Sequence, residues 1–141
     1  MSAEGTVVAP VFRYSAVTFD CGDPVQLAGF YGEMLGLPVV FATEDFVFLG
    51  QGEGVAGLGF SRLEGYRAPG WPGDGDGDGD GGVGGGGEKR AHVEVGVDDL
   101  DGAEAWLLEL GAVKPDFQPD PERWRVLLDP AGHPFCISTL V

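Results

Sequence analysis

The sequence predicts an α+β domain made of two copies of one βαβββ module, which pack together as a half-barrel. The alternating apolar pattern at 17–23 returns at 93–99, and a helical pattern ending in Leu-Gly follows each copy. A segment of mainly Gly and Asp, at about 64–89, separates the copies and is typical of a flexible linker. We therefore expect one domain that spans the chain, with module 1 at about 13–63 and module 2 at about 90–141.

The elements of module 1 follow from apolar spacing and from helix-capping residues. Residues 14–21 alternate as a strand does. Asp23 suits a helix N-cap, Pro24 suits the first helical position, and Gly36 suits a left-handed C-terminal cap. The helix has one apolar stripe, and three short strands follow it. The stripe is Leu27, Phe30, Tyr31, Met34 and Leu35, and the strands are expected at 39–43, 45–49 and 55–62.

Module 2 begins with the stretch around which the chain is organised, R-A-H-V-E-V-G-V at 90–97. It predicts a strand with one apolar face and one face that can carry chemistry. Asp98 or Asp99 is expected to cap the next helix, with Trp106 on its buried face and Gly111 at its end. The apolar face of this strand has Val93, Val95 and Val97, and the other face has His92, Glu94 and Gly96. The last three strands of the module are expected near 113–118, 123–128 and 134–140.

Composition excludes several classes of function. The formal net charge is -15 and only eight residues are Lys or Arg, which argues against nucleic-acid binding and favours a solvated acidic surface. No apolar run is long enough to cross a membrane, and we see no signal peptide. Without a secretion signal, Cys21 and Cys136 are expected to be reduced thiols in the cytoplasm.

The order of elements resembles the vicinal oxygen chelate superfamily, which includes glyoxalase I, extradiol dioxygenases and bleomycin-resistance proteins. Within it the chain is most similar to the glyoxalase-like domains. The resemblance covers 14–139 apart from the linker, and it implies the paired-module fold and a two-fold homodimer. The motifs that carry it are D-P-V-Q-L-A-G-F-Y-G-E-M-L-G at 23–36, W-P at 71–72, H-V-E-V-G-V-D-D-L at 92–100, L-G-A at 110–112 and D-P-A-G-H-P-F-C-I at 129–137.

Metal-dependent members of this superfamily hold their ion at four strand positions, which fall here at Ala16, about Gly57, His92 and Cys136. The family pattern has His, Gln or Glu at the first two, His at the third and Glu at the fourth. Only His92 conforms, although Cys136 could bind as a thiolate. One imidazole and one thiol are too few for a site with three protein ligands, so we expect neither a metal nor another cofactor. Glu94 and Asp20 would add ligands only if their strands lie differently from the placement predicted here.

The favoured function is a metal-free protein that binds a small, largely apolar or aromatic molecule in a concave pocket. His92 and Glu94, two residues apart on one strand face, would supply its polarity, and the acidic surface would attract a cationic ligand. For His92 a buried, hydrogen-bonded core role stays open, and for the aromatic residues so does core packing. The expected ligand-binding residues are His92, Glu94, Phe60, Trp71, Trp124 and Cys136.

Two other functions remain open. The chain could be a lyase, isomerase or dioxygenase that uses His92 as a metal ligand, or as an acid/base with Glu94. It could also be a structural or regulatory dimer with a vestigial pocket. His133 is expected to be a surface turn residue, and the Asp-Gly run at 74–81 is expected to be linker, because Gly stands where a calcium loop needs its last glutamate.

Overall fold

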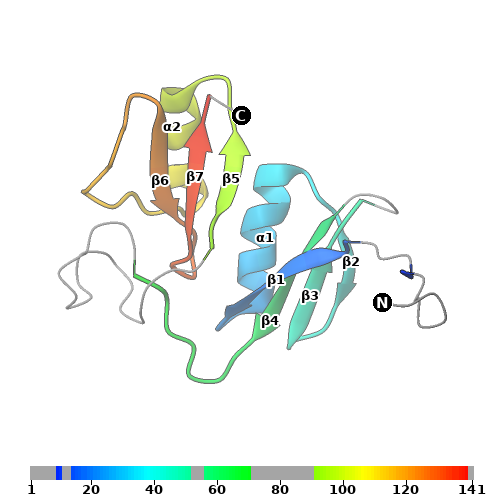
Figure 1. The fold of residues 1–141 in the computed structure, drawn as a ribbon. Coiled ribbons are helices and arrows are strands. Elements are labelled where there is room, and N and C mark those ends of the chain that lie inside the picture. The colour runs from blue at the N-terminus through cyan, green and yellow to red at the C-terminus, as the bar shows by residue number, and fades with distance from the viewer. Residues whose placement is uncertain (1–8, 11–13, 52–55, 71–90, 140–141) are drawn as a thin grey trace, which may run out of the picture.

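The structure is a computed structural model that describes residues 9–10, 14–51, 56–70 and 91–139 (Figure 1). Within these ranges the chain forms a four-stranded sheet of order β1-β4-β3-β2 and a three-stranded sheet of order β5-β7-β6, with one helix in each module. Most of the expected linker, including Trp71 and the Asp-Gly run, lies outside the described residues. The elements are β1 Ala16–Cys21, α1 Pro24–Leu35, β2 Val39–Ala42, β3 Phe46–Leu49, β4 Gly57–Arg62, β5 Val93–Gly96, α2 Leu100–Leu110, β6 Trp124–Leu128 and β7 Pro134–Ser138.

Helix α1 begins and ends at the predicted residues. The Asp23 side chain accepts a hydrogen bond from the backbone N–H of Gln26, and Pro24 opens the helix. Gly36 has φ 69°, a left-handed conformation that glycine adopts without steric cost. The apolar stripe of α1 is buried against the first sheet, and Leu27, Phe30, Tyr31, Val47, Leu49 and Phe60 form the centre of that core.

Helix α2 is correctly predicted, and its buried face is too except at Trp106. Asp99 is the N-cap, and Leu100, Ala103, Leu107 and Leu110 pack on the core at the spacing of an amphipathic helix. Trp106 is 50% exposed, so its expected place on the buried face is wrong. It directly precedes Leu107, and one residue corresponds to about 100° around a helix, which turns Trp106 out of the apolar stripe.

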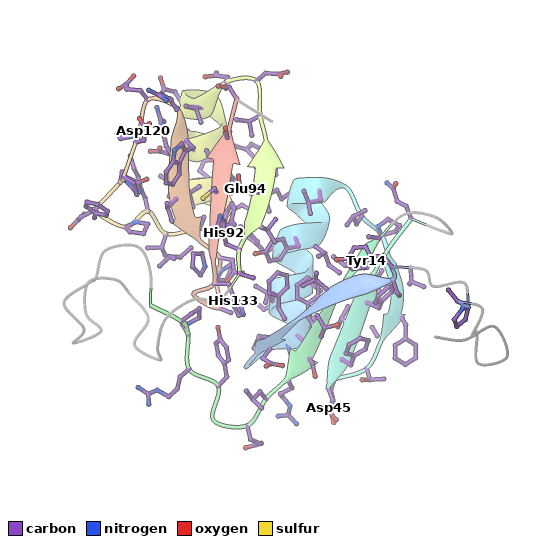
Figure 2. The ribbon with its side chains drawn as sticks, viewed as in Figure 1. Tyr14, Asp45, His92, Glu94, Asp120 and His133 are labelled. Atoms are coloured by element: carbon purple, nitrogen blue, oxygen red, sulfur yellow. The ribbon has the colours of Figure 1, made fainter. Side chains whose placement is uncertain are left out.

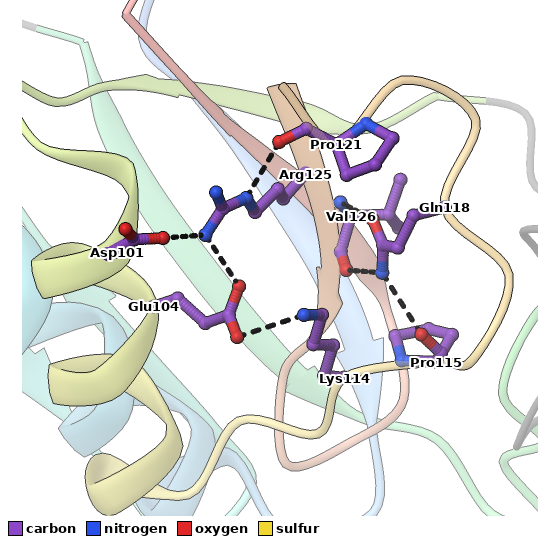
Figure 3. A network of polar contacts seen from close by, with 8 residues as sticks. All are labelled: Asp101, Glu104, Lys114, Pro115, Gln118, Pro121, Arg125 and Val126. Carbon is purple, nitrogen blue, oxygen red and sulfur yellow. Dashed lines mark hydrogen bonds and ion pairs between the residues drawn. The ribbon is translucent and has the colours of Figure 1, made fainter. Parts of the chain in front are cut away.

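The strand expected near 113–118 is reduced to a single bridge between Val113 and Leu128. Pro115 has no backbone N–H to continue the pairing. The Gln118 side chain replaces it, since its Nε2 donates to the Val126 carbonyl at 2.9 Å and its Oε1 accepts from the Val126 N–H at 2.8 Å (Figure 3). A side-chain amide thereby does what a neighbouring strand would do for β6.

An ionic network ties α2 to the rest of module 2 (Figure 3). Arg125 of β6 contacts Asp101 at 2.9 Å and Glu104 at 3.0 Å, both on the helix. Glu104 also accepts from Lys114 at 3.0 Å, and Arg125 donates through Nε to the Pro121 carbonyl at 2.9 Å. The network holds the helix, the strand and the loop between them as one unit.

The two modules meet where the β6–β7 turn packs against module 1. Asp129 is buried, and its Oδ2 accepts from the Tyr31 hydroxyl at 2.7 Å. Its Oδ1 accepts from the backbone N–H groups of Ala131 at 2.8 Å and His133 at 3.0 Å. Burial raises the pKa of Asp129 above its ordinary value and raises the pKa of Tyr31 well above its own.

His133 lies in this turn, as predicted, and helps to join the modules (Figure 2). Its Nε2 is 2.7 Å from the Asp20 carbonyl, which can only accept, so Nε2 carries the proton. The Tyr66 hydroxyl lies 3.1 Å from the same nitrogen and donates to the Ala131 carbonyl at 2.9 Å. These contacts give His133 a structural role at the junction.

Helix α1 packs on β3 and β4 of the first sheet, and it also meets the second sheet, where Phe30 and Tyr31 contact Phe135 of β7 with ring centroids 5.9 and 6.3 Å apart. Helix α2 packs on β7. Each sheet therefore turns its core face toward the helix of its own module. Among the described residues no helix is long and apolar enough to cross a membrane.

Candidate functional site

The candidate site lies on the second sheet, where β5 and β7 pair in parallel. Glu94 is the direct neighbour of Cys136 in this pairing, so their side chains share one face. His92 comes two residues before Glu94 and lies on the same face. His92 Nε2 is 2.8 Å from Glu94 Oε2 (Figure 2), and one ligating atom from each of the three residues lies within 4.8 Å of the others.

The three side chains run from the protein interior to the solvent. Cys136 is 2% exposed, the His92 side chain is 26% exposed and that of Glu94 is 51% exposed. Val93 and Val95 point to the opposite face and pack on the core, as their alternation predicts. The strand therefore has one structural face and one face with acid/base and metal-ligating groups.

Trp124 shares this polar face. It begins β6, and two residues later Val126 pairs directly with Cys136. Since side chains alternate along a strand, Trp124 and Val126 lie on the same side of the sheet as Cys136. We call this side the outer face of the second sheet. Among the described residues of this face are His92, Glu94, Gly96, Trp124, Val126, Leu128, Pro134, Cys136 and Ser138.

Phe60 does not lie with these residues. It is fully buried, and its ring stacks on Phe19 and Tyr31 with centroids 5.9 and 5.5 Å apart. Its strand alternates, so Phe60 faces α1 while Gly57 and Gly59 face outward. In this structure Phe60 offers no surface to a ligand at His92, and Trp71 is outside the described residues.

Sequence reasoning missed the aromatic residues on the outer face of the first sheet. Phe41, Phe46 and Phe48 lie there, and the rings of Phe41 and Phe46 have centroids 6.4 Å apart. The stretch F-V-F-L is apolar throughout, so alternation alone could not assign its faces. The signal that could have done so is Gly57-x-Gly59 on β4, because these glycines leave the space that the rings of Phe48 and Phe46 fill.

The residues present do not fit the four-position metal centre that the resemblance implies. Ala16 and Gly57 are direct neighbours on β1 and β4, as a shared site would need, but neither has a ligating side chain. A Cβ at Gly57 would collide with the Leu49 carbonyl oxygen and would lie 2.8 Å from the Phe48 ring. At these two positions the first module therefore contributes neither a ligand nor room for one, and within the described ranges the candidate ligands grouped with His92 come from the second module.

The two cysteines differ in their surroundings, and neither is in a disulfide. Cys21 lies in the core, where its Sγ donates to the Ser61 carbonyl at 3.7 Å, and burial raises its pKa to about 11. Cys136 lies beside an imidazole and a carboxylate. Cys136 is therefore the thiol placed for metal binding or for ligand contact.

Comparison with known proteins agrees with the fold. No curated protein matches the sequence. A glyoxalase/bleomycin resistance protein/dioxygenase family enzyme from Burkholderia phytofirmans has a similar structure, with TM-score 0.59 and 19% identity over 90% of this chain and 98% of its own. The bleomycin-binding protein of Streptomyces verticillus, solved with copper(II)-bleomycin, has TM-score 0.51 and 16% identity, and the match covers 92% of this chain and 98% of that one. Trypanothione-dependent glyoxalase I of Leishmania major has TM-score 0.55 and 20% identity, and the match covers 91% of this chain and 86% of that one.

At these identities the structural matches establish the fold alone. The family follows from the sequence itself, because the family model for the glyoxalase-like domain matches residues 16–138, which include both modules and the segment between them. The chain belongs to the glyoxalase-like domain family of the vicinal oxygen chelate superfamily.

Proposed function

We propose that this chain is a cytoplasmic small-molecule-binding protein that works without the four-position metal centre of its metal-dependent relatives. The observation that carries the proposal is the His92–Glu94 pair, which is partly exposed on the outer face of the second sheet, the face that also has Trp124. A polar pair and an indole on one sheet face suit a largely apolar or aromatic ligand with one polar group. The Streptomyces verticillus neighbour, which binds bleomycin, offers a precedent in this fold.

Charge narrows the ligand class. The formal net charge of -15 produces a negative potential that attracts cations, and the exposed Glu94 carboxylate can accept a hydrogen bond from an ammonium or guanidinium group. We infer that aromatic amines are better ligands than aromatic acids of the same size.

We further propose a two-fold homodimer. Among the described residues the edge strands are β1 and β2 in the first sheet and β5 and β6 in the second, and unpaired edges are places where a second chain can add. The first sheet also exposes several large apolar residues: Val17, Val39, Val40 and Phe41. Light scattering at micromolar concentration is expected to give twice the 14.7 kDa chain mass, and a monomer would reject the proposal.

A second candidate function is proton transfer. The 2.8 Å contact between His92 and Glu94 has the geometry in which a carboxylate orients an imidazole for acid/base work. Turnover of a bound carbonyl compound that disappears in both His92→Ala and Glu94→Gln would favour this enzyme over a binding protein.

The test of the proposed function compares the two histidines. Small aromatic amines are screened by thermal shift, and the tightest is titrated into wild type, His92→Ala and His133→Ala. His92→Ala is expected to lower affinity about 5- to 100-fold, which corresponds to the ~1–3 kcal/mol of a lost hydrogen bond, with little effect on stability. His133→Ala is expected to lower stability and leave affinity unchanged, because His133 joins the modules. Unchanged affinity in His92→Ala, with lower stability, would make His92 a structural residue.

A further inference from the structure

We infer that Cys136 is a nucleophilic thiol, with His92 as its base and Glu94 as the residue that orients His92, and that this thiol adds to uncharged conjugated carbonyl compounds. The product is a covalent adduct on the outer face of the second sheet. The inference therefore goes beyond the reversible binding proposed above and does not depend on it.

The three side chains have the arrangement that an activated nucleophile needs. Glu94 of β5 pairs directly with Cys136 of β7, and His92 lies two residues before Glu94 on the same face. Cys136 Sγ, a ring nitrogen of His92 and a carboxylate oxygen of Glu94 all lie within 4.8 Å of one another. A proton can cross such a separation through one water or after a small rotation of a side chain, and sites without their ligand are often this loose.

The contact with Glu94 decides which nitrogen of His92 acts as the base. His92 Nε2 is 2.8 Å from Glu94 Oε2 (Figure 2), and a carboxylate can only accept a hydrogen bond, so Nε2 carries the proton of the neutral ring. The lone pair is then on Nδ1, which is the atom that can take the thiol proton. The carboxylate stabilises the imidazolium that forms.

The addition needs no oxidant and no other reactant. His92 Nδ1 takes the proton from Cys136 Sγ, and the sulfur lone pair forms a bond to the β-carbon of the conjugated carbonyl compound. The π electrons of the carbon–carbon double bond move to the carbonyl oxygen and give an enolate. The α-carbon of the enolate then takes the proton back from Nδ1. One S–H bond and one π bond are replaced by one S–C bond and one C–H bond.

The surroundings of Cys136 select the class of electrophile. Cys136 is 2% exposed and shares its face with Trp124 and Val126, so a small or flat apolar molecule fits best. The Glu94 side chain is half exposed, so its rotation can admit such a molecule, while its charge repels anions. A peroxide fits less well, because a cysteine that senses oxidants often has a resolving cysteine beside it, and Cys21 lies in the core of the first module.

The experiment measures how fast excess N-ethylmaleimide, an uncharged conjugated carbonyl compound, alkylates each cysteine of the full-length folded protein. Modified peptides are quantified by mass spectrometry, and the same reaction in urea gives the reference rate of each thiol. Burial raises the pKa of Cys21 to about 11, which keeps this thiol protonated at neutral pH. Cys136 is therefore expected to react at least about tenfold faster than Cys21 in the folded protein.

Substitution of His92 tests the base. His92→Gln keeps the approximate size of the side chain but removes the base, so it is expected to slow alkylation of Cys136 by at least about tenfold. His133→Gln is the matched control and is expected to leave this rate unchanged, because His133 lies at the junction of the modules. Free imidazole is expected to accelerate the reaction in His92→Ala and not in wild type, which a structural role of His92 would not produce.

A double substitution tests the role of Glu94. Glu94→Gln is expected to slow alkylation in wild type and to have no further effect in His92→Gln, because Glu94 acts through His92. Equal rates for Cys136 and Cys21, or a Cys136 rate that His92→Gln leaves unchanged, would overturn the inference. Amine binding that depends on His92, together with an unreactive Cys136, would overturn this inference alone and leave the proposed function standing.

Discussion

Tyr31→Phe tests how the two modules are joined. The substitution removes one hydroxyl and keeps the ring, so the stacking of residue 31 on Phe19 and Phe60 is preserved. What is lost is the 2.7 Å hydrogen bond to Asp129, a carboxyl group that is 1% exposed. Water cannot easily replace the hydroxyl at this depth, so Asp129 keeps only its two backbone N–H donors.

The expected loss of stability follows from the kind of hydrogen bond removed. A bond to a charged or buried acceptor contributes ~1.5–3 kcal/mol, whereas a neutral one contributes ~0.5–1.5 kcal/mol. For a chain of this size 1 kcal/mol corresponds to roughly 4 °C in Tm, so Tyr31→Phe is expected to lower Tm by about 6–12 °C. Tyr66→Phe removes a bond to the Ala131 backbone carbonyl and is expected to lower Tm by about 2–6 °C.

The assay is calorimetric unfolding of wild type and both variants at neutral pH. The two substitutions are chemically identical and act at the same junction, but Tyr31→Phe removes a donor to a buried carboxyl, whereas Tyr66→Phe removes contacts with the Ala131 carbonyl and with His133 Nε2. Equal shifts in Tm for Tyr31→Phe and Tyr66→Phe, or no shift for Tyr31→Phe, would refute the view that Asp129 and Tyr31 together hold the modules.

Three further predictions concern stability. Burial raises the pKa of Asp129 in the folded protein. Its contribution to the free energy of unfolding is therefore complete below its ordinary pKa of about 4 and is lost as pH rises through the folded-state pKa. Asp129→Asn should remove this pH dependence from the free energy of unfolding, measured with urea across a range of pH. Gln118→Ala should cost about 1–3 kcal/mol in the same assay, since it leaves both backbone groups of Val126 without their partner. Gly57→Ala should lower Tm because its Cβ meets backbone and ring atoms, whereas Gly29→Ala, on the exposed side of α1, should stabilise by about 0.5–1 kcal/mol.

The sequence predicts the fold well where local physics decides the structure. The cap at Asp23, the left-handed Gly36 and the stripe of α1 all depend on residues within one or two helical turns. Because the second module repeats the pattern of the first, the same argument predicts its first strand and its helix. The errors arise where a longer-range contact decides: Trp106 lies one position outside the stripe, and the Gln118 side chain takes the place of an expected strand.

The site was predictable in part for the same reason. His92 and Glu94 share a face by alternation within one strand, which the sequence reveals directly. The position of Cys136 beside them depends on the register of β5 against β7, which involves residues far apart in the chain. Phe60 was placed in the site in error, since alternation from Gly57, a site-facing position, puts it on the opposite face, and the fold turns it into the core.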